Sequence, residues 1–140
     1  MTELRIPGDG SDGVTISIPE RDHRDARSEG WLDAEVWVKL GAWSGRYSAQ
    51  FHEDDFSPFA EKLGELHTTL KGDATLTSLD GYLDLTLTGD GLGHISVVGE
   101  LWDQPRVASH LVVSYNTDQT ALPPLQASLA SLAAYLNRTR

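Results

Sequence analysis

The sequence contains no cysteine, one methionine, and only 11 lysine and arginine residues against 21 aspartates and glutamates. The lack of cysteine excludes disulfide bonds, thiolate metal sites and cysteine nucleophiles, and it fits a cytoplasmic protein. No apolar run approaches the roughly 20 residues that a membrane-spanning helix requires. The first residues, Met-Thr-Glu-Leu-Arg-Ile-Pro, lack the apolar stretch of a secretory signal.

The scarcity of cations gives the chain a net charge of −10. Phosphate contacts require clustered lysines and arginines, so neither nucleic acid nor an anionic membrane surface is an expected partner. The acidity would instead attract a basic protein and accelerate its association. The simpler interpretation is that the charge only keeps the protein soluble.

Hydrophobic patterning predicts one folded domain over residues 1–140, with residues 1–30 partly disordered or peripheral. Residues 31–40 and 43–52 pair in one register across Gly41-Ala42, which suits a type II′ turn. A one-residue slip would exchange the two faces, so the register is well specified. The apolar pairs are Leu40–Trp43, Val38–Gly45, Val36–Tyr47, Ala34–Ala49 and Leu32–Phe51. The polar pairs are Trp37–Arg46, Glu35–Ser48, Asp33–Gln50 and Trp31–His52.

Further strands are predicted on both sides of this hairpin. A second hairpin turns at Asp80-Gly81, a type I′ signal, and pairs Leu76 with Leu85 and Thr75 with Thr86. Alternating patterns predict strands over residues 14–18, 94–102 and 110–115. No internal repeat is evident.

Two amphipathic helices complete the prediction. The first would be capped by Ser57 with Pro58 at its first position, and the second would begin near Thr120. Their apolar stripes are Phe56, Phe59, Leu63, Leu66 and Leu70, and Leu122, Leu125, Leu129, Leu132 and Leu136. These elements predict an α+β two-layer fold, an antiparallel sheet of about seven strands with both helices packed on one face.

Three short segments suggest chemistry but are better explained structurally. Gly89-Asp90-Gly91-Leu92-Gly93 resembles a phosphate loop, yet a strand follows where a helix is required. Residues 52–55 (His-Glu-Asp-Asp) offer metal ligands without a matching second cluster, and acidic residues also favour a helix start. Residues 21–27 mix both charge signs around His23 and predict a solvated segment.

Catalysis finds little support. No serine lies in a Gly-x-Ser-x-Gly elbow, and the histidines are scattered singly. Carboxylate pairs such as Asp33/Glu35 or Asp84/Glu100 would lie on an open sheet face, where pKa tuning is difficult. The sequence therefore predicts no catalytic residue, no cofactor and no metal site. The alternative is a small enzyme or ligand-binding protein that uses this open polar face.

The outward sheet face is the candidate protein-binding site, because exposed tryptophans are unusual and often anchor interfaces, while carboxylates select basic partners. In the other interpretation, Arg46 covers Trp37 through a cation–π contact, and loops or a homodimer partner shield the rest. The candidate residues are Trp31, Asp33, Glu35, Trp37, Arg46, Asp84, Glu100 and Trp102.

Several signatures in residues 56–136 resemble the family of small bacterial proteins typified by the WapI immunity protein. They are Phe59…Leu63…Leu66, Lys71-Gly72-Asp73-Ala74, Gly93-His94-Ile95 and Asp118-Gln119-Thr120-Ala121-Leu122. The resemblance implies an α+β protein that binds and neutralises a cognate toxin by occlusion. It implies no catalytic residues, and the expected partner is a basic toxin domain. The protein would be a monomer or a homodimer.

Overall fold

Two successive units, each of four strands and one helix, make up the structure. It is a computed structural model that describes residues 1–20, 30–105, 107 and 109–138, although nothing is described of the Arg138 side chain. The predicted solvated segment, residues 21–27, lies outside the described residues. The first unit contains β1 (Thr2–Pro7), β2 (Gly13–Ile18), β3 (Trp31–Leu40), β4 (Trp43–His52), the 3-10 turn η1 (Glu53–Asp55) and α1 (Phe56–Thr69). The second contains β5 (Lys71–Thr77), β6 (Leu83–Asp90), β7 (His94–Leu101), β8 (Leu111–Asp118), the 3-10 turn η2 (Gln119–Ala121) and α2 (Leu122–Arg138).

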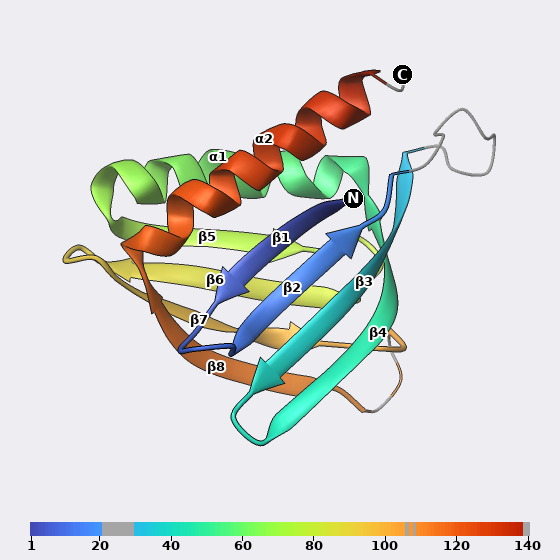
Figure 1. Cartoon of the computed structure of the whole chain (residues 1–140), viewed down its shortest axis with the longest axis horizontal. Coiled ribbons are helices and arrows are strands. Elements are labelled where there is room, and N and C mark those ends of the chain that lie inside the picture. The colour runs from blue at the N-terminus through green and yellow to red at the C-terminus, as the bar shows by residue number, and fades with distance from the viewer. Residues whose placement is uncertain (21–29, 106, 108, 139–140) are drawn as a thin grey trace.

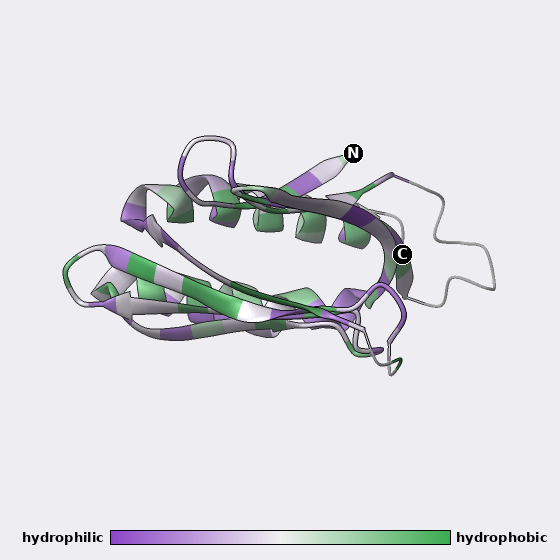
Figure 2. Ribbon diagram, turned by 90° about the horizontal axis from the view of Figure 1, so that it is seen from below, coloured by the Kyte–Doolittle hydropathy of each residue, from purple (hydrophilic) through white to green (hydrophobic). Residues whose placement is uncertain are grey.

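The strands form two antiparallel sheets, sheet A in the order β1-β2-β3-β4 and sheet B in the order β5-β6-β7-β8. The sheets lie as two layers, and the helices lie together along one side of them (Figures 1 and 2). Helix α1 contacts the edge strand β5, α2 contacts the edge strand β1, and the helices contact each other. The inner sheet faces and both helical stripes therefore enclose one shared core.

This architecture confirms an α+β antiparallel fold but corrects its arrangement. There are two sheets of four strands among the described residues, not one sheet of about seven. The helices accordingly do not both cover one face of one sheet. Residues 2–18, expected at the periphery, supply two strands of sheet A, and Leu4, Ile6 and Ile16 from them are fully buried. Local alternation predicts hairpins, but it does not say which hairpins share a sheet.

The first hairpin has the predicted register, and Val36 lies opposite Tyr47 on the inner face. Gly41 has a φ of 62° whereas Ala42 has no positive φ, as a type II′ turn requires. Trp43 departs from the prediction, because its side chain is 74% exposed. The end of this hairpin extends beyond sheet B (Figure 1), so sheet B does not cover the apolar side at Trp43.

The second hairpin also has the predicted pairs, but its turn differs. Thr77 pairs with Asp84, and the chain between them forms a longer loop rather than a two-residue type I′ turn. Only Gly81 in this loop has a positive φ, whereas a type I′ turn needs two such residues. The Ser78 amide donates to the Leu83 carbonyl and holds the loop closed.

The predicted helix starts are displaced by the 3-10 turns. The His52 side chain, not Ser57, accepts the capping hydrogen bond, from the Asp54 amide. Asp118 does the same for the Thr120 amide, so α2 begins at Leu122 rather than Thr120. His52 at the end of β4 and Asp118 at the end of β8 therefore accept hydrogen bonds from amides at the helix starts, which have no partner within the helix.

The two helices occupy equivalent places in the two units. Each follows a last strand and a 3-10 turn, and each carries its buried residues at the same spacing. Phe56, Phe59, Leu63 and Leu66 of α1 correspond in order to Leu122, Leu125, Leu129 and Leu132 of α2, and all are buried. The structure therefore contains a ββββα repeat that sequence similarity does not reveal.

Two tyrosines connect the units. From β4, the Tyr47 hydroxyl donates to the Tyr82 carbonyl at 2.8 Å, and from β8 the Tyr115 hydroxyl donates to the Ile6 carbonyl at 2.6 Å. Burial raises the pKa of both phenols well above the ordinary range, since a buried phenolate would lose its hydration. The hydroxyls therefore remain donors, and each fixes one sheet against the other.

Candidate protein-binding surface

The predicted site residues do not lie on one face. Trp31, Asp33, Glu35, Trp37 and Arg46 belong to the outer face of sheet A. Asp84 and Glu100 form a cross-strand pair on sheet B, and Trp102 follows β7. The outer faces of the two layers point in opposite directions (Figure 2), so one flat partner surface cannot cover both groups.

On sheet B, the Trp102 indole is covered by a histidine. Trp102 and His110 stack with their ring centroids 4.0 Å apart and their planes 12° apart. His110 Nε2 lies 4.0 Å from the Glu100 carboxylate. This arrangement matches the interpretation in which an outward tryptophan is shielded by the protein itself.

Trp31 is also engaged, since its ring meets the His52 ring edge-on at 5.1 Å. Trp37 is different because 43% of its surface is exposed, even though the Arg46 guanidinium lies over its ring at 4.8 Å. The cation–π contact holds the indole in place and leaves it accessible.

Trp37 belongs to a row of outward side chains that crosses sheet A. Arg5 lies opposite Thr15, Thr15 opposite Trp37, and Trp37 opposite Arg46, so one residue of each strand contributes. Trp37 therefore has Arg46 on one side and Thr15 on the other, and Arg5 lies beyond Thr15 on β1.

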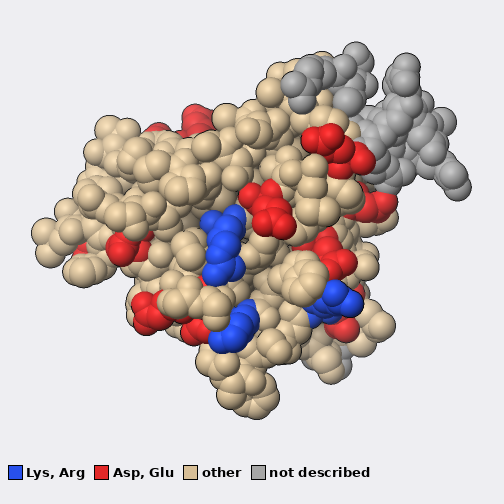
Figure 3. Space-filling view, viewed as in Figure 1, with Lys and Arg blue, Asp and Glu red and all other residues tan. Residues whose placement is uncertain are grey.

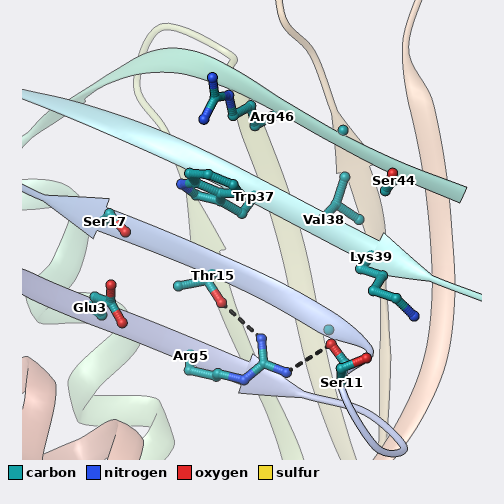
Figure 4. Close-up of a pocket in the computed structure, with 12 residues that line it drawn as sticks. Glu3, Arg5, Ser11, Thr15, Ser17, Trp37, Val38, Lys39, Ser44 and Arg46 are labelled. Carbon is teal, nitrogen blue, oxygen red and sulfur yellow. Dashed lines mark hydrogen bonds between the residues drawn. The ribbon is translucent and has the colours of Figure 1, made fainter.

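A groove runs along β2 on this face, because the outward residues of β2 are all small: Gly13, Thr15 and Ser17. Longer side chains of β1 and β3, among them Arg5 and Trp37, form its walls (Figure 4). The hollow has a volume of about 590 Å³. We call it the β2 groove; its lining residues are Glu3, Arg5, Ser11, Gly13, Thr15, Ser17, Trp37, Val38, Lys39, Ser44, Gly45 and Arg46.

The end of the β2 groove near the β1–β2 loop is cationic. Arg5 donates to the Thr15 hydroxyl at 2.9 Å and to the carbonyls of Ser11 and Asp12 at 3.2 and 2.8 Å. Lys39 Nζ lies 3.1 Å from the Asp12 carboxylate. The hydrogen bonds from Lys39 and from the Gly41 amide lower the pKa of Asp12, so this carboxylate remains charged and ties the loop to the first hairpin.

The opposite end is acidic. A second hollow of about 310 Å³ continues from the β2 groove past Ser17 and is lined by Glu3, Asp33 and Glu35. Figure 3, which looks onto this face, shows blue side chains grouped over sheet A with red ones around them. The surface therefore changes sign along β2, with Trp37 at the boundary.

Among the described residues, no three His, Asp or Glu side chains come close enough to hold a metal ion. Residues 52–55 have structural roles: His52 caps η1, and Asp55 accepts from the His52 amide at 2.8 Å. In the described part of the chain, no helix is long and apolar enough to cross a membrane.

Sequence reasoning found Trp37 and Arg46 but missed the residues that make the β2 groove. Arg5 lies far from Trp37 along the chain, whereas Lys39 follows it by two residues on the same outward face of β3. The alternation of Glu3 and Arg5 with Leu4 and Ile6 was the available signal for β1. The groove needs β1 as its second wall, so it cannot be predicted unless β1 is recognised as a strand that pairs with β2.

The fold and this surface define a class: a small two-sheet α+β protein with polar outer sheet faces. The family model of the "Immunity protein WapI-like family" matches residues 5–138, nearly the whole chain. The chain belongs to this family, as the resemblance predicted.

The other comparisons provide information on the fold alone. The chain matches none of the curated proteins. A crystal structure of MRP1/MRP2 from Trypanosoma brucei is similar with a TM-score of 0.50 and 11% sequence identity, covering 96% of this chain and 84% of that one. At this identity, the similarity shows a shared arrangement of strands and helices.

Proposed function

We propose that this protein is a non-catalytic immunity protein that binds a cognate bacterial toxin domain and neutralises it by occlusion. The observation that carries the proposal is the match of the WapI-like immunity family to residues 5–138. The partly exposed Trp37, which Arg46 holds in place, supports a binding role, because tryptophans often anchor interfaces.

The charge supports a basic partner. A net charge of −10 attracts a basic domain over several ångströms and steers its approach. The partner would be a toxin domain that acts in the cytoplasm, where the immunity protein would meet it before damage occurs.

The test starts with the genomic neighbourhood, where we expect a gene for a large secreted protein with a basic C-terminal domain. A pull-down with that domain follows, and then co-expression of the two. We expect a stable complex and restored growth of cells that produce the toxin domain. Absence of binding to this domain would contradict the proposal. Turnover of a small substrate that depends on His52 or His94 would instead favour the enzyme alternative.

A further inference from the structure

We propose that the cationic end of the β2 groove is where the toxin docks, and that it binds an extended acidic segment of the toxin. A carboxylate of that segment would lie between Arg5 and Lys39, with the neighbouring residue against Trp37. This inference rests on the proposed immunity function and names the face and the chemistry of recognition.

The first argument is the distribution of cations. The lysine and arginine side chains that the structure describes are Arg5, Lys39, Arg46, Lys62 and Lys71. Three of these line one hollow in a chain whose net charge is −10. Two of the three are paired with carboxylates, Lys39 with Asp12 at 3.1 Å and Arg46 with Glu35 at 3.8 Å. The three cations therefore exceed their two paired carboxylates by one positive charge, and Arg5 is the cation that this excess leaves for a ligand.

The second argument is that Arg5 is positioned but not neutralised. Its three hydrogen bonds go to a hydroxyl and two carbonyls, and no carboxylate of the described residues lies within ion-pair distance. A guanidinium has five N–H donors, so donors remain for a ligand. Because the neutral partners fix its orientation, Arg5 would lose little conformational freedom on binding a carboxylate.

The third argument is the shape of the hollow. The floor follows β2, whose outward residues are small, and the walls come from β1 and β3. A trough of this form fits an extended chain better than a rounded ligand, since alternate side chains of an extended segment point into it. Trp37 offers a partly exposed indole that Arg46 already holds in place, as an interface anchor requires.

The acidic surroundings make the site selective. A mostly basic toxin is attracted by the whole molecule, but only an acidic segment is complementary to the Arg5–Lys39 end. A basic segment placed there would be repelled by Arg5, which has no carboxylate partner among the described residues, while Glu3 and Glu35 would repel an acidic segment shifted along β2. The change of sign along the groove therefore fixes the orientation of the partner.

The experiment measures the dissociation constant of the inactivated toxin domain by calorimetry. Replacing both Arg5 and Lys39 with Glu should weaken binding by at least about tenfold, equivalent to about 1.4 kcal/mol. The matched control replaces Lys62 and Lys71 with Glu, which changes the net charge equally but lies outside the groove. The control should bind no more weakly than wild type, since it makes the protein more acidic.

Arg5 also supports the β1–β2 loop, so its replacement can disturb folding as well as binding. A second variant therefore tests the groove and keeps Arg5. Thr15→Trp fills the groove floor. Its control is Thr75→Trp on the outer face of sheet B. The two positions match because each threonine hydroxyl forms one hydrogen bond, Thr15 with Arg5 and Thr75 with Thr86. Thr15→Trp should also weaken binding by about tenfold or more, and Thr75→Trp should not.

The outcomes separate the two proposals. If wild type binds the toxin domain and both groove variants bind like their controls, the docking site is wrong and the immunity function stands. If wild type does not bind the domain, both proposals fail. If an acidic residue of the toxin, changed to Lys, restores binding to the Arg5→Glu, Lys39→Glu protein, the assigned pairing is established.

Discussion

At the residue scale, the hydrogen bond from Tyr115 to the Ile6 carbonyl ties β8 to β1 across the two sheets. Tyr115→Phe removes the donor and keeps the ring, so it should lower the free energy of unfolding by about 0.5–1.5 kcal/mol. Urea denaturation measures the change. Tyr82→Phe is the control, because the Tyr82 hydroxyl forms no hydrogen bond with another residue in the described part of the chain. Equal stability of the two variants would show that the connection contributes nothing.

The same tyrosines predict a loss of stability in alkali. Burial raises the pKa of Tyr47 and Tyr115 above the ordinary value of 10.0. A raised pKa means that the folded state holds the proton more tightly, so this contribution is complete below pH 10 and is lost as the pH rises beyond it. Denaturation followed between pH 9 and about 11.5 should show a smaller loss for the Tyr47→Phe, Tyr115→Phe double variant than for wild type. Parallel curves would contradict this origin.

At the element scale, the stripe of α2 supplies one wall of the shared core, and Leu129 is only 5% exposed within it. Leu129→Ala leaves a cavity and should cost roughly 2–5 kcal/mol of unfolding free energy. Leu92→Ala is the control, because Leu92 lies in a turn and is 83% exposed; its change should stay within about 0.5 kcal/mol. A cost below about 0.5 kcal/mol at Leu129 would mean that α2 does not pack as described.

The same scale shows what sequence can and cannot predict. The hairpin registers follow from local alternation and turns, so the pairs around Val36 and Leu85 were predictable. The division into two sheets was not, because β4 leads into a helix and nothing local shows that β5 begins a new layer. For the candidate site, the pair Trp37–Arg46 follows from one hairpin register. The contribution of Arg5 does not, since it requires the β1–β2 pairing across the loop.

At the scale of the whole molecule, two kinds of acidic residue become distinguishable. Glu35 lies on sheet A beside the β2 groove, and Asp84 lies on the outer face of sheet B. Long-range steering depends on the summed charge, so both faces contribute to the approach of a basic partner. Contacts formed after docking depend on one face only. Association and dissociation rates should therefore respond to different sets of substitutions.

This separation gives a kinetic prediction with the inactivated toxin domain. Glu35→Gln and Asp84→Asn should each slow association, and the effect should fade as salt rises, because the screening length falls to about 8 Å near 0.15 M ionic strength. Trp37→Ala should chiefly speed dissociation, since it removes an anchor from the docked surface. Trp102→Ala should leave dissociation unchanged, because Trp102 stacks on His110 on the opposite layer. Faster dissociation of Trp102→Ala with an unaffected Trp37→Ala would place the toxin on sheet B instead.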